Sequence, residues 1–158
     1  MPQNIEYLPT PTIQPQRVDL RGPKSLSGSA PVVREDGLYS YAIMRTDIVM
    51  PPGKLAAQAA HVCAQSLIEF LTRHPDRTPE FQQLGKSGSR IVLGTKRLSH
   101  LLQAADAARA AGLPCALFED SGHILLPDFT GDPVITGLGI GPAPREAMRE
   151  ITKRFRCL

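Results

Sequence analysis

The stretch that decides the fold is Pro52-Gly53-Lys54-Leu55-Ala56-Ala57-Gln58-Ala59-Ala60-His61, together with the apolar residues that follow it. Pro51 and Pro52 oppose a strand that continues through them and a helix that begins before them, because proline lacks the backbone N–H that either would use. From Leu55 to Leu71 the chain is rich in Ala, Leu, Ile and Val and contains no Gly or Pro. This length and composition predict a helix that begins at the prolines and packs closely through its small residues.

Three polar side chains lie on one face of this expected helix. Lys54, Gln58 and His61 are spaced at i, i+4 and i+7, so they project in the same direction. Free N–H groups at a helix N-terminus favour anions, so these side chains are candidates for a phosphate-facing site. The alternative is a solvated polar stripe on a half-buried helix, and this stretch alone leaves both interpretations open.

Composition sets the class of protein. A chain of 158 residues with 42% hydrophobic and 21% charged residues is typical of one globular domain. The net charge of +3 permits a polyanionic partner without requiring one. The three cysteines have no C-x-x-C spacing, which argues against a disulfide framework and a structural zinc site and indicates a reducing, cytoplasmic setting. No apolar run approaches the roughly 20 residues that cross a bilayer, so no membrane association is expected.

Residues 1–36 differ in composition from the rest of the chain. They contain six of the fifteen prolines, and their formal charges cancel. Such a segment can bury little apolar surface, so we expect a proline-rich flexible N-terminal arm that can dock on a protein partner. The folded domain is expected to span residues 37–158.

Within this domain, apolar strand patterns alternate with helical ones. Strands are expected at 38–45, 90–94, 115–120 and 133–140, and helices at 55–71, 98–111 and 145–156. A further short helix is expected after the loop at 73–77, with Thr78 as its cap and Pro79 at its first position. No helix separates the third and fourth strands, so the sheet is expected to be mixed rather than all-parallel. The pattern predicts an α/β fold with three layers, in which helices cover both faces of a four-stranded mixed β-sheet.

Two acidic residues follow expected strands. Asp47 ends the first strand, and Asp120 ends the third, where Ser121, Gly122 and His123 come next. In α/β sheets, ligand sites gather beyond the carboxyl ends of strands, so these side chains are candidates for a site. An ordinary turn explains Asp120-Ser121-Gly122 equally well, because Asp and Gly favour turns for conformational reasons.

Taken in order, several short motifs resemble the archaeal and eukaryotic-type (type 2) peptidyl-tRNA hydrolase family. They are Arg45-Thr46-Asp47, Gly53-Lys54-Leu55-Ala56-Ala57-Gln58 with His61, Gly112-Leu113-Pro114, Asp120-Ser121-Gly122 and Leu138-Gly139-Ile140-Gly141-Pro142-Ala143-Pro144. The ordered set spans about Tyr39 to Leu158. The arm lies outside the resemblance.

The resemblance implies an enzyme that cleaves the ester between a peptide, or an N-acyl amino acid, and the 3′ ribose of tRNA. It implies that Lys54 and Asp120 are catalytic, without a metal or other cofactor: a carboxylate can activate water, and a lysine can stabilise an oxyanion. Candidate substrate-binding residues are Asp47, Gln58, His61, Ser121 and His123. Candidate contacts to the RNA backbone are Lys86, Arg90, Lys96, Arg97, Lys153 and Arg154. A homodimer is compatible with the sequence.

One position departs from the family pattern. The family usually has threonine four residues after the aspartate, and this chain has Ile124, which neither donates nor accepts a hydrogen bond. The alternative to an enzyme is therefore a non-catalytic member of the fold that binds RNA or docks on a larger assembly through its N-terminal arm.

Overall fold

The computed structural model describes residues 37–77 and 88–158. The predicted arm, the short helix expected at Thr78 and Pro79, and Lys86 lie outside these ranges. A mixed five-stranded sheet forms the centre of the domain, with strand order β3-β6-β1-β2-β7. The strands are β1 (Leu38–Arg45), β2 (Ser89–Thr95), β3 (Cys115–Asp120), β6 (Val134–Pro144) and β7 (Arg156–Cys157).

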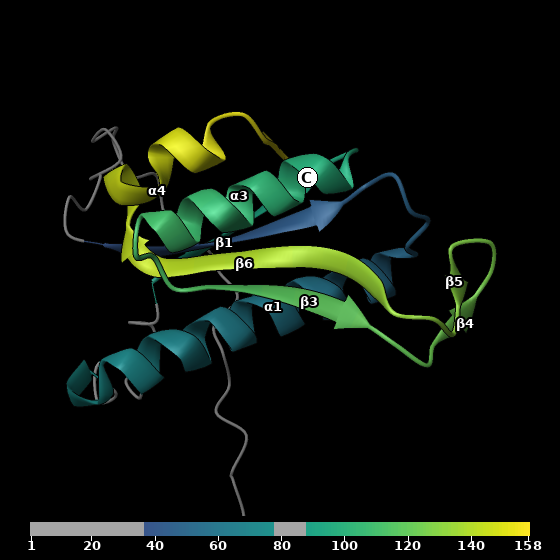
Figure 1. The fold of residues 1–158 in the computed structure, drawn as a ribbon, viewed down its shortest axis with the longest axis horizontal. Helices are drawn as coiled ribbons and strands as arrows, with labels where there is room; N and C mark the ends of the chain where they lie inside the picture. Colours follow the sequence, from purple (N-terminus) through teal and green to yellow (C-terminus); the bar gives the residue numbers. More distant parts are fainter. Residues whose placement is uncertain (1–36, 78–87) are drawn as a thin grey trace, which may run out of the picture. The chain divides into compact units, whose positions relative to one another are not determined.

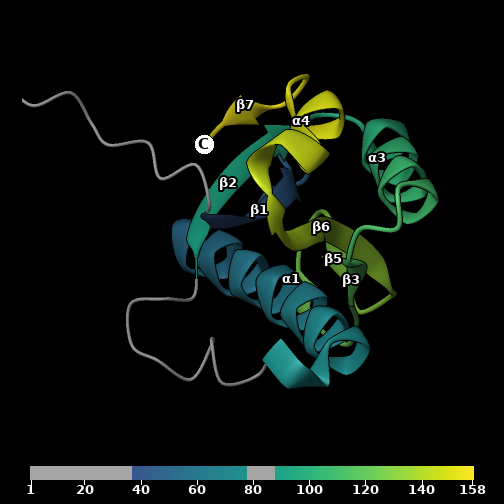
Figure 2. The same cartoon turned by 90° about the vertical axis from the view of Figure 1, so that its left-hand side faces the viewer.

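Helices cover both faces of this sheet (Figures 1 and 2). Helix α1 (Pro52–Arg73) lies on one face, where Ala59 and Val62 pack against Ala42 and Met44 of β1. Helices α3 (Leu98–Ala110) and α4 (Arg145–Thr152) lie on the other face, and a 3-10 helix, η1 (Pro75–Arg77), follows α1. Within the described ranges, no helix is both long and apolar enough to cross a membrane. The predicted three-layer α/β architecture is confirmed.

Strand direction brings three strand ends to one edge. β1 and β2 are parallel, and β6 is antiparallel to both β1 and β3. β1, β2 and β3 therefore run in the same direction, and their carboxyl ends share one edge of the sheet (Figure 1). The predicted mixed sheet is confirmed, because it contains both parallel and antiparallel pairs.

The expectation of four strands is wrong, because β7 adds a fifth strand beside β2. A separate two-stranded hairpin, β4 (Ile124–Leu125) and β5 (Phe129–Thr130), also forms in the segment of chain that connects β3 to β6. Each of these three strands has two residues, which is too short for an alternating apolar pattern to show in sequence. The terminal helix is correspondingly shorter than expected, since α4 ends at Thr152 and the chain returns as β7.

The fourth strand is longer than the expected 133–140, because β6 continues to Pro144. A register shift between Tyr39 and Tyr41 of β1 lets the ladder continue, so Leu38 and Tyr39 still pair with Pro144 and Ala143. The second expected helix is observed as α3, and Gly112, with φ of 67°, follows its C-cap residue Ala111.

A glycine in β6 sets how closely α1 approaches the sheet. A Cβ on Gly139 would lie 2.1 Å from the backbone oxygen of Val62 in α1. Only glycine allows this contact, so Gly139 holds α1 directly against the sheet. This close packing positions the first turns of α1 beside the shared carboxyl edge.

Candidate active site

Lys54 and Asp120 meet at the carboxyl edge of the sheet. Lys54 lies in the first turn of α1, Asp120 is the last residue of β3, and Lys54 Nζ is 2.5 Å from Asp120 Oδ2. Their side chains are only 12% and 13% exposed. Because α1 begins after β1, which ends at the same edge as β3, the topology brings together two residues that are 66 positions apart.

Gln58 binds the same carboxylate oxygen from the next turn of α1. Its Nε2 donates to Asp120 Oδ2 at 3.0 Å, and its Oε1 accepts a hydrogen bond of 2.6 Å from Thr136 Oγ1. A carboxylate only accepts, so the Gln58 amino group must face Asp120 and its carbonyl must face the threonine hydroxyl. Thr136 is fully buried in β6, and it therefore fixes the orientation of the Gln58 amide.

This arrangement leaves one oxygen of Asp120 available. Both donors, Lys54 and Gln58, bind Oδ2. No donor from residues 37–77 or 88–158 binds Oδ1. Oδ1 can therefore accept a hydrogen bond from a water molecule or a substrate hydroxyl.

The β4–β5 hairpin forms a second wall of the site. Phe129 of β5 is 1% exposed, and its ring centroid lies 4.0 Å from Lys54 Nζ, within cation–π distance. The His123 ring meets Phe129 edge-on at 6.1 Å. Asp128 accepts a hydrogen bond of 2.7 Å from the backbone N–H of Val49, which ties the hairpin to the loop before α1. The hairpin thus holds an aromatic ring against the lysine.

Ile124 lies on this hairpin and outside the cluster around Asp120. It pairs with Thr130, whereas its neighbour Leu125 pairs with Phe129. Successive side chains of a strand point to opposite faces, so Ile124 projects away from the face that carries Phe129. Its 71% exposure agrees with this direction.

His61 lies on the same helix face as Lys54 and Gln58, as the spacing predicts, and it makes a different contact. Its ring stacks on Phe118 of β3, with centroids 4.7 Å apart and planes 8° from parallel. Phe118 precedes Asp120 by two residues, so His61 lies beside the Lys54–Asp120 pair along the same strand. The side chain is exposed to solvent.

Asp47 pairs with its near neighbour Arg45. Arg45 Nε and Nη2 donate to the two Asp47 oxygens at 3.0 and 2.7 Å. This hydrogen bonding by Arg45 holds the pKa of the Asp47 carboxyl below its ordinary value. Asp47 and Ser121 lie at the carboxyl edge, and within the described part of the chain neither bonds to Lys54, Gln58 or Asp120.

The predicted RNA-contacting cations divide into two groups by position. Lys96 and Arg97 are exposed and directly follow β2, at the same edge as Lys54 and Asp120. Arg90 lies at the opposite end of that strand. Lys153 pairs with Glu150, and Arg154 donates to the His100 carbonyl at 3.1 Å. Arg154 lines a cavity together with Thr46, Thr95 and Lys96, so it lies near Lys96 at this edge, whereas Arg90 does not.

Sequence reasoning missed Thr136 and Phe129. Thr136 is the one polar residue in the apolar run from Val134 to Ile140, and a hydroxyl in a buried strand requires a hydrogen-bond partner, so the sequence did indicate it. Phe129 gave no signal, because its place depends on a hairpin of two-residue strands. In the part of the chain that the structure describes, no three His, Cys, Asp or Glu side chains gather as metal ligands.

The fold and this cluster define a class: a mixed-sheet α/β protein with a buried lysine–carboxylate pair at the carboxyl edge, suited to acid–base chemistry. A family model described as "Peptidyl-tRNA hydrolase PTH2" matches residues 38–158. The chain belongs to the PTH2 family of peptidyl-tRNA hydrolases.

Curated relatives agree with this assignment. Proteins named peptidyl-tRNA hydrolase from Staphylothermus marinus and Sulfolobus acidocaldarius are 34% and 33% identical over 116 and 119 residues. Each alignment covers 73% of this chain, and they cover 91% and 96% of the relatives. The relative from Metallosphaera sedula is 32% identical over 116 residues, with 73% and 96% coverage. These names support a hydrolase at the level of the family and give no support to the non-catalytic alternative.

Proposed function

We propose that the protein hydrolyses the ester that joins a peptide, or an N-acyl amino acid, to the 3′ ribose of tRNA, and so releases free tRNA. The observation that carries this proposal is the buried Lys54–Asp120 pair at the carboxyl edge of the sheet. The names of its relatives support the same reaction class.

Asp120 is the proposed general base. Its Oδ2 is occupied by Lys54 and Gln58, so Oδ1 is the oxygen that orients a water molecule and accepts its proton as the water attacks the ester carbonyl. Gln58, itself held by Thr136, keeps the carboxylate in the rotamer that presents Oδ1. Gln58 and Thr136 are thus positioning residues in this proposal.

Lys54 is the proposed electrostatic partner. Its ammonium has three N–H groups, and one of them binds Asp120. The others can donate to the carbonyl oxygen of the ester as negative charge develops there, and low exposure to water strengthens this interaction. Phe129 limits where the ammonium can move, because its ring lies against Nζ.

Substrate contacts follow from position along the same edge. We assign Asp47, His61, Ser121 and His123 to the rim that binds the acyl group and the terminal nucleotide. Lys96 and Arg97 are suited to the RNA backbone, since exposed cations at this edge attract phosphates. Arg90 is less suited to this role because it lies at the far end of β2.

The direct test is hydrolysis of an N-acetyl-aminoacyl-tRNA by the purified full-length protein. We expect release of free tRNA, and a loss of about 10²-fold or more in kcat/KM for Lys54→Met and for Asp120→Asn. Arg109→Met is the matched control, because that cation is exposed and pairs with Asp106. Absence of release at high protein concentration, or full activity of folded Lys54→Met protein, would refute the proposal.

A second variant tests whether the departure at position 124 matters. Ile124 projects away from the Phe129 face of the hairpin, so Ile124→Thr should leave kcat/KM unchanged. A large gain in rate for this variant would instead mean that a hydroxyl at position 124 reaches the reacting groups.

We also propose that residues 37–158 form the complete catalytic domain. The family match begins at residue 38, and the residues assigned above all lie after it. Protein shortened to residues 37–158 should therefore keep the full-length kcat/KM. A loss of activity in a folded, shortened protein would assign a catalytic contribution to residues 1–36.

A further inference from the structure

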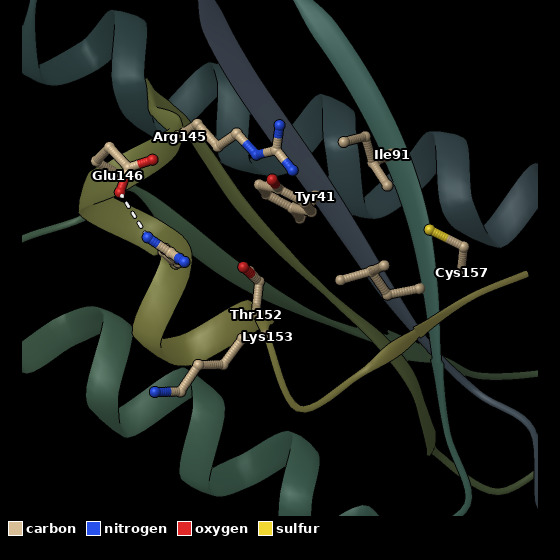
Figure 3. A pocket seen from close by; sticks show the side chains of 9 residues that line it. Tyr41, Ile91, Arg145, Glu146, Thr152, Lys153 and Cys157 are labelled. Carbon is tan, nitrogen blue, oxygen red and sulfur yellow. Dashed lines mark ion pairs between the residues drawn. The ribbon is translucent and has the colours of Figure 1, made fainter.

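A cavity lies on the opposite face of the sheet from α1, Lys54 and Gln58. It has a volume of about 450 Å³, opens to solvent, and is lined by residues of β1, β2, α4 and β7 (Figure 3). Its walls include Tyr41, Arg145 and Arg149, and Ile91 and Leu93 also line it. This volume falls within the range of small-molecule sites. The proposed hydrolysis does not use this cavity.

Tyr41 supplies a polar group to the cavity wall. Its hydroxyl makes no hydrogen bond to any of residues 37–77 or 88–158, and no buried side-chain polar atom of these residues lacks a partner, so the hydroxyl is open to the cavity. A hydroxyl in this position can donate to or accept from a ligand atom. Figure 3 shows the hydroxyl end of Tyr41 directed toward the side of the cavity from which Arg145 extends.

Arg145 supplies an unpaired positive charge beside it. Two other cations near the cavity have acidic partners on α4: Arg149 lies 3.6 Å from Glu146, and Lys153 pairs with Glu150. Arg145 has no carboxylate partner within the described ranges, and its guanidinium lies 5.9 Å from the centre of the Tyr39 ring. A guanidinium without a counterion suits a carboxylate or phosphate, which it can bind through two parallel hydrogen bonds.

The apolar residues define the rest of the ligand. Ile91 and Leu93 of β2 line the cavity beside Tyr41, and the lining set carries one acidic residue, Glu146, against three cations. We propose that this cavity binds a small organic anion, in which a carboxylate or phosphate group is attached to an apolar body. Arg145 and the Tyr41 hydroxyl hold the anionic group, and Ile91 and Leu93 contact the apolar body.

Binding of defined probes to the full-length protein tests this proposal independently of catalysis. Phenyl phosphate and phenylacetate carry both parts of the expected ligand, whereas inorganic phosphate carries only the anionic group. By calorimetry we expect at least one aromatic anion to bind with a dissociation constant of about 1 mM or below, and at least tenfold more tightly than inorganic phosphate. The aromatic anion that binds more tightly identifies the preferred anionic group.

Variants locate the binding. Arg145→Gln and Tyr41→Phe should each weaken the affinity about tenfold, because each loses a hydrogen bond to a charged group. Arg109→Gln removes the same charge from exposed α3 and should leave the affinity unchanged. Thermal unfolding checks that Tyr41→Phe, which keeps the buried ring, is folded. The proposal is wrong if neither aromatic anion saturates the protein, or if both cavity variants bind as the parent does.

Discussion

Replacing Thr136 by valine should disable the candidate site without touching any proposed catalytic group. Valine has nearly the shape of threonine, so the substitution removes the hydroxyl and leaves the packing of β6 intact. The Gln58 Oε1 then loses the 2.6 Å hydrogen bond that orients the amide. Gln58 is 5% exposed, so water cannot easily replace the missing donor.

Two free energies follow from this geometry. An unsatisfied buried acceptor costs about 1–3 kcal/mol of stability. When the Gln58 amide rotates, Asp120 also loses the 3.0 Å donation from Nε2, a hydrogen bond to a charged group worth about 1.5–3 kcal/mol. If that bond is needed in the transition state, kcat/KM falls about ten- to a hundredfold.

Thr136→Ser is the matched control because it changes packing and keeps the hydroxyl. It deletes one fully buried methyl group, which costs about 1 kcal/mol. Urea unfolding should therefore find both variants less stable than the parent. Hydrolysis of N-acetyl-aminoacyl-tRNA should separate them, with serine near the parent rate and valine far below it.

A third protein tests whether the effect passes through Gln58. Gln58→Met already removes the amide, so adding Thr136→Val to it should lower kcat/KM little further. The reasoning is refuted if Thr136→Val hydrolyses within twofold of the parent, or if Thr136→Ser is equally impaired. Additive losses in the double variant would mean that Thr136 acts by another route.

Three further outcomes test the fold and its titrating groups. Gly139→Ala should lower stability by about 3 kcal/mol in urea unfolding, because its Cβ would lie 2.1 Å from the α1 backbone; an unchanged midpoint would contradict the close approach of α1. Iodoacetamide at pH 8 should modify exposed Cys157 well before Cys63, because burial raises the pKa of the Cys63 thiol. Peptide mass spectrometry measures the two rates, and equal rates would contradict this prediction. In NMR titrations Arg45→Met should raise the pKa of Asp47, since the Arg45 hydrogen bonds hold it low. Because folding lowers this pKa, the Asp47–Arg45 pair stabilises the folded protein at pH values above the unfolded-state pKa of about 3.9. This stabilisation is lost as the pH falls through the pKa of the folded state. Arg45→Met should therefore lower the free energy of unfolding at neutral pH and leave it unchanged at the acid limit.

The main elements of the fold could be predicted because their signals are local. The two prolines and the uninterrupted apolar run after them determine α1, and the apolar block from Leu38 to Arg45 is observed unchanged as β1. Alternation of strands and helices then implies the mixed sheet. Once β1 and β3 are parallel, Asp120 and the start of α1 must meet at one edge, so the Lys54–Asp120 encounter was within reach of sequence reasoning.

The parts that could not be predicted depend on contacts between distant segments. β7 pairs with β2 through two residues, and that pairing uses backbone groups that every sequence possesses. Phe129 reaches Lys54 only because the hairpin folds back across the end of β3. The direction of the Ile124 side chain depends on the pairing of two-residue strands in the β4–β5 hairpin, which no local sequence pattern indicates.

The energetics of the cluster argue that it exists for chemistry. A nearly buried ion pair contributes little net stability, because the desolvation of both charges offsets their attraction. The Phe129 ring lies against Lys54 Nζ, and an apolar side chain at position 54 would also pack on this ring. The site instead adds Gln58 and Thr136, two more buried polar groups, in a single line of hydrogen bonds from the interior of β6 to Asp120. That line saturates one carboxylate oxygen and leaves the other open, which an ion pair that served only to stabilise the fold would not require.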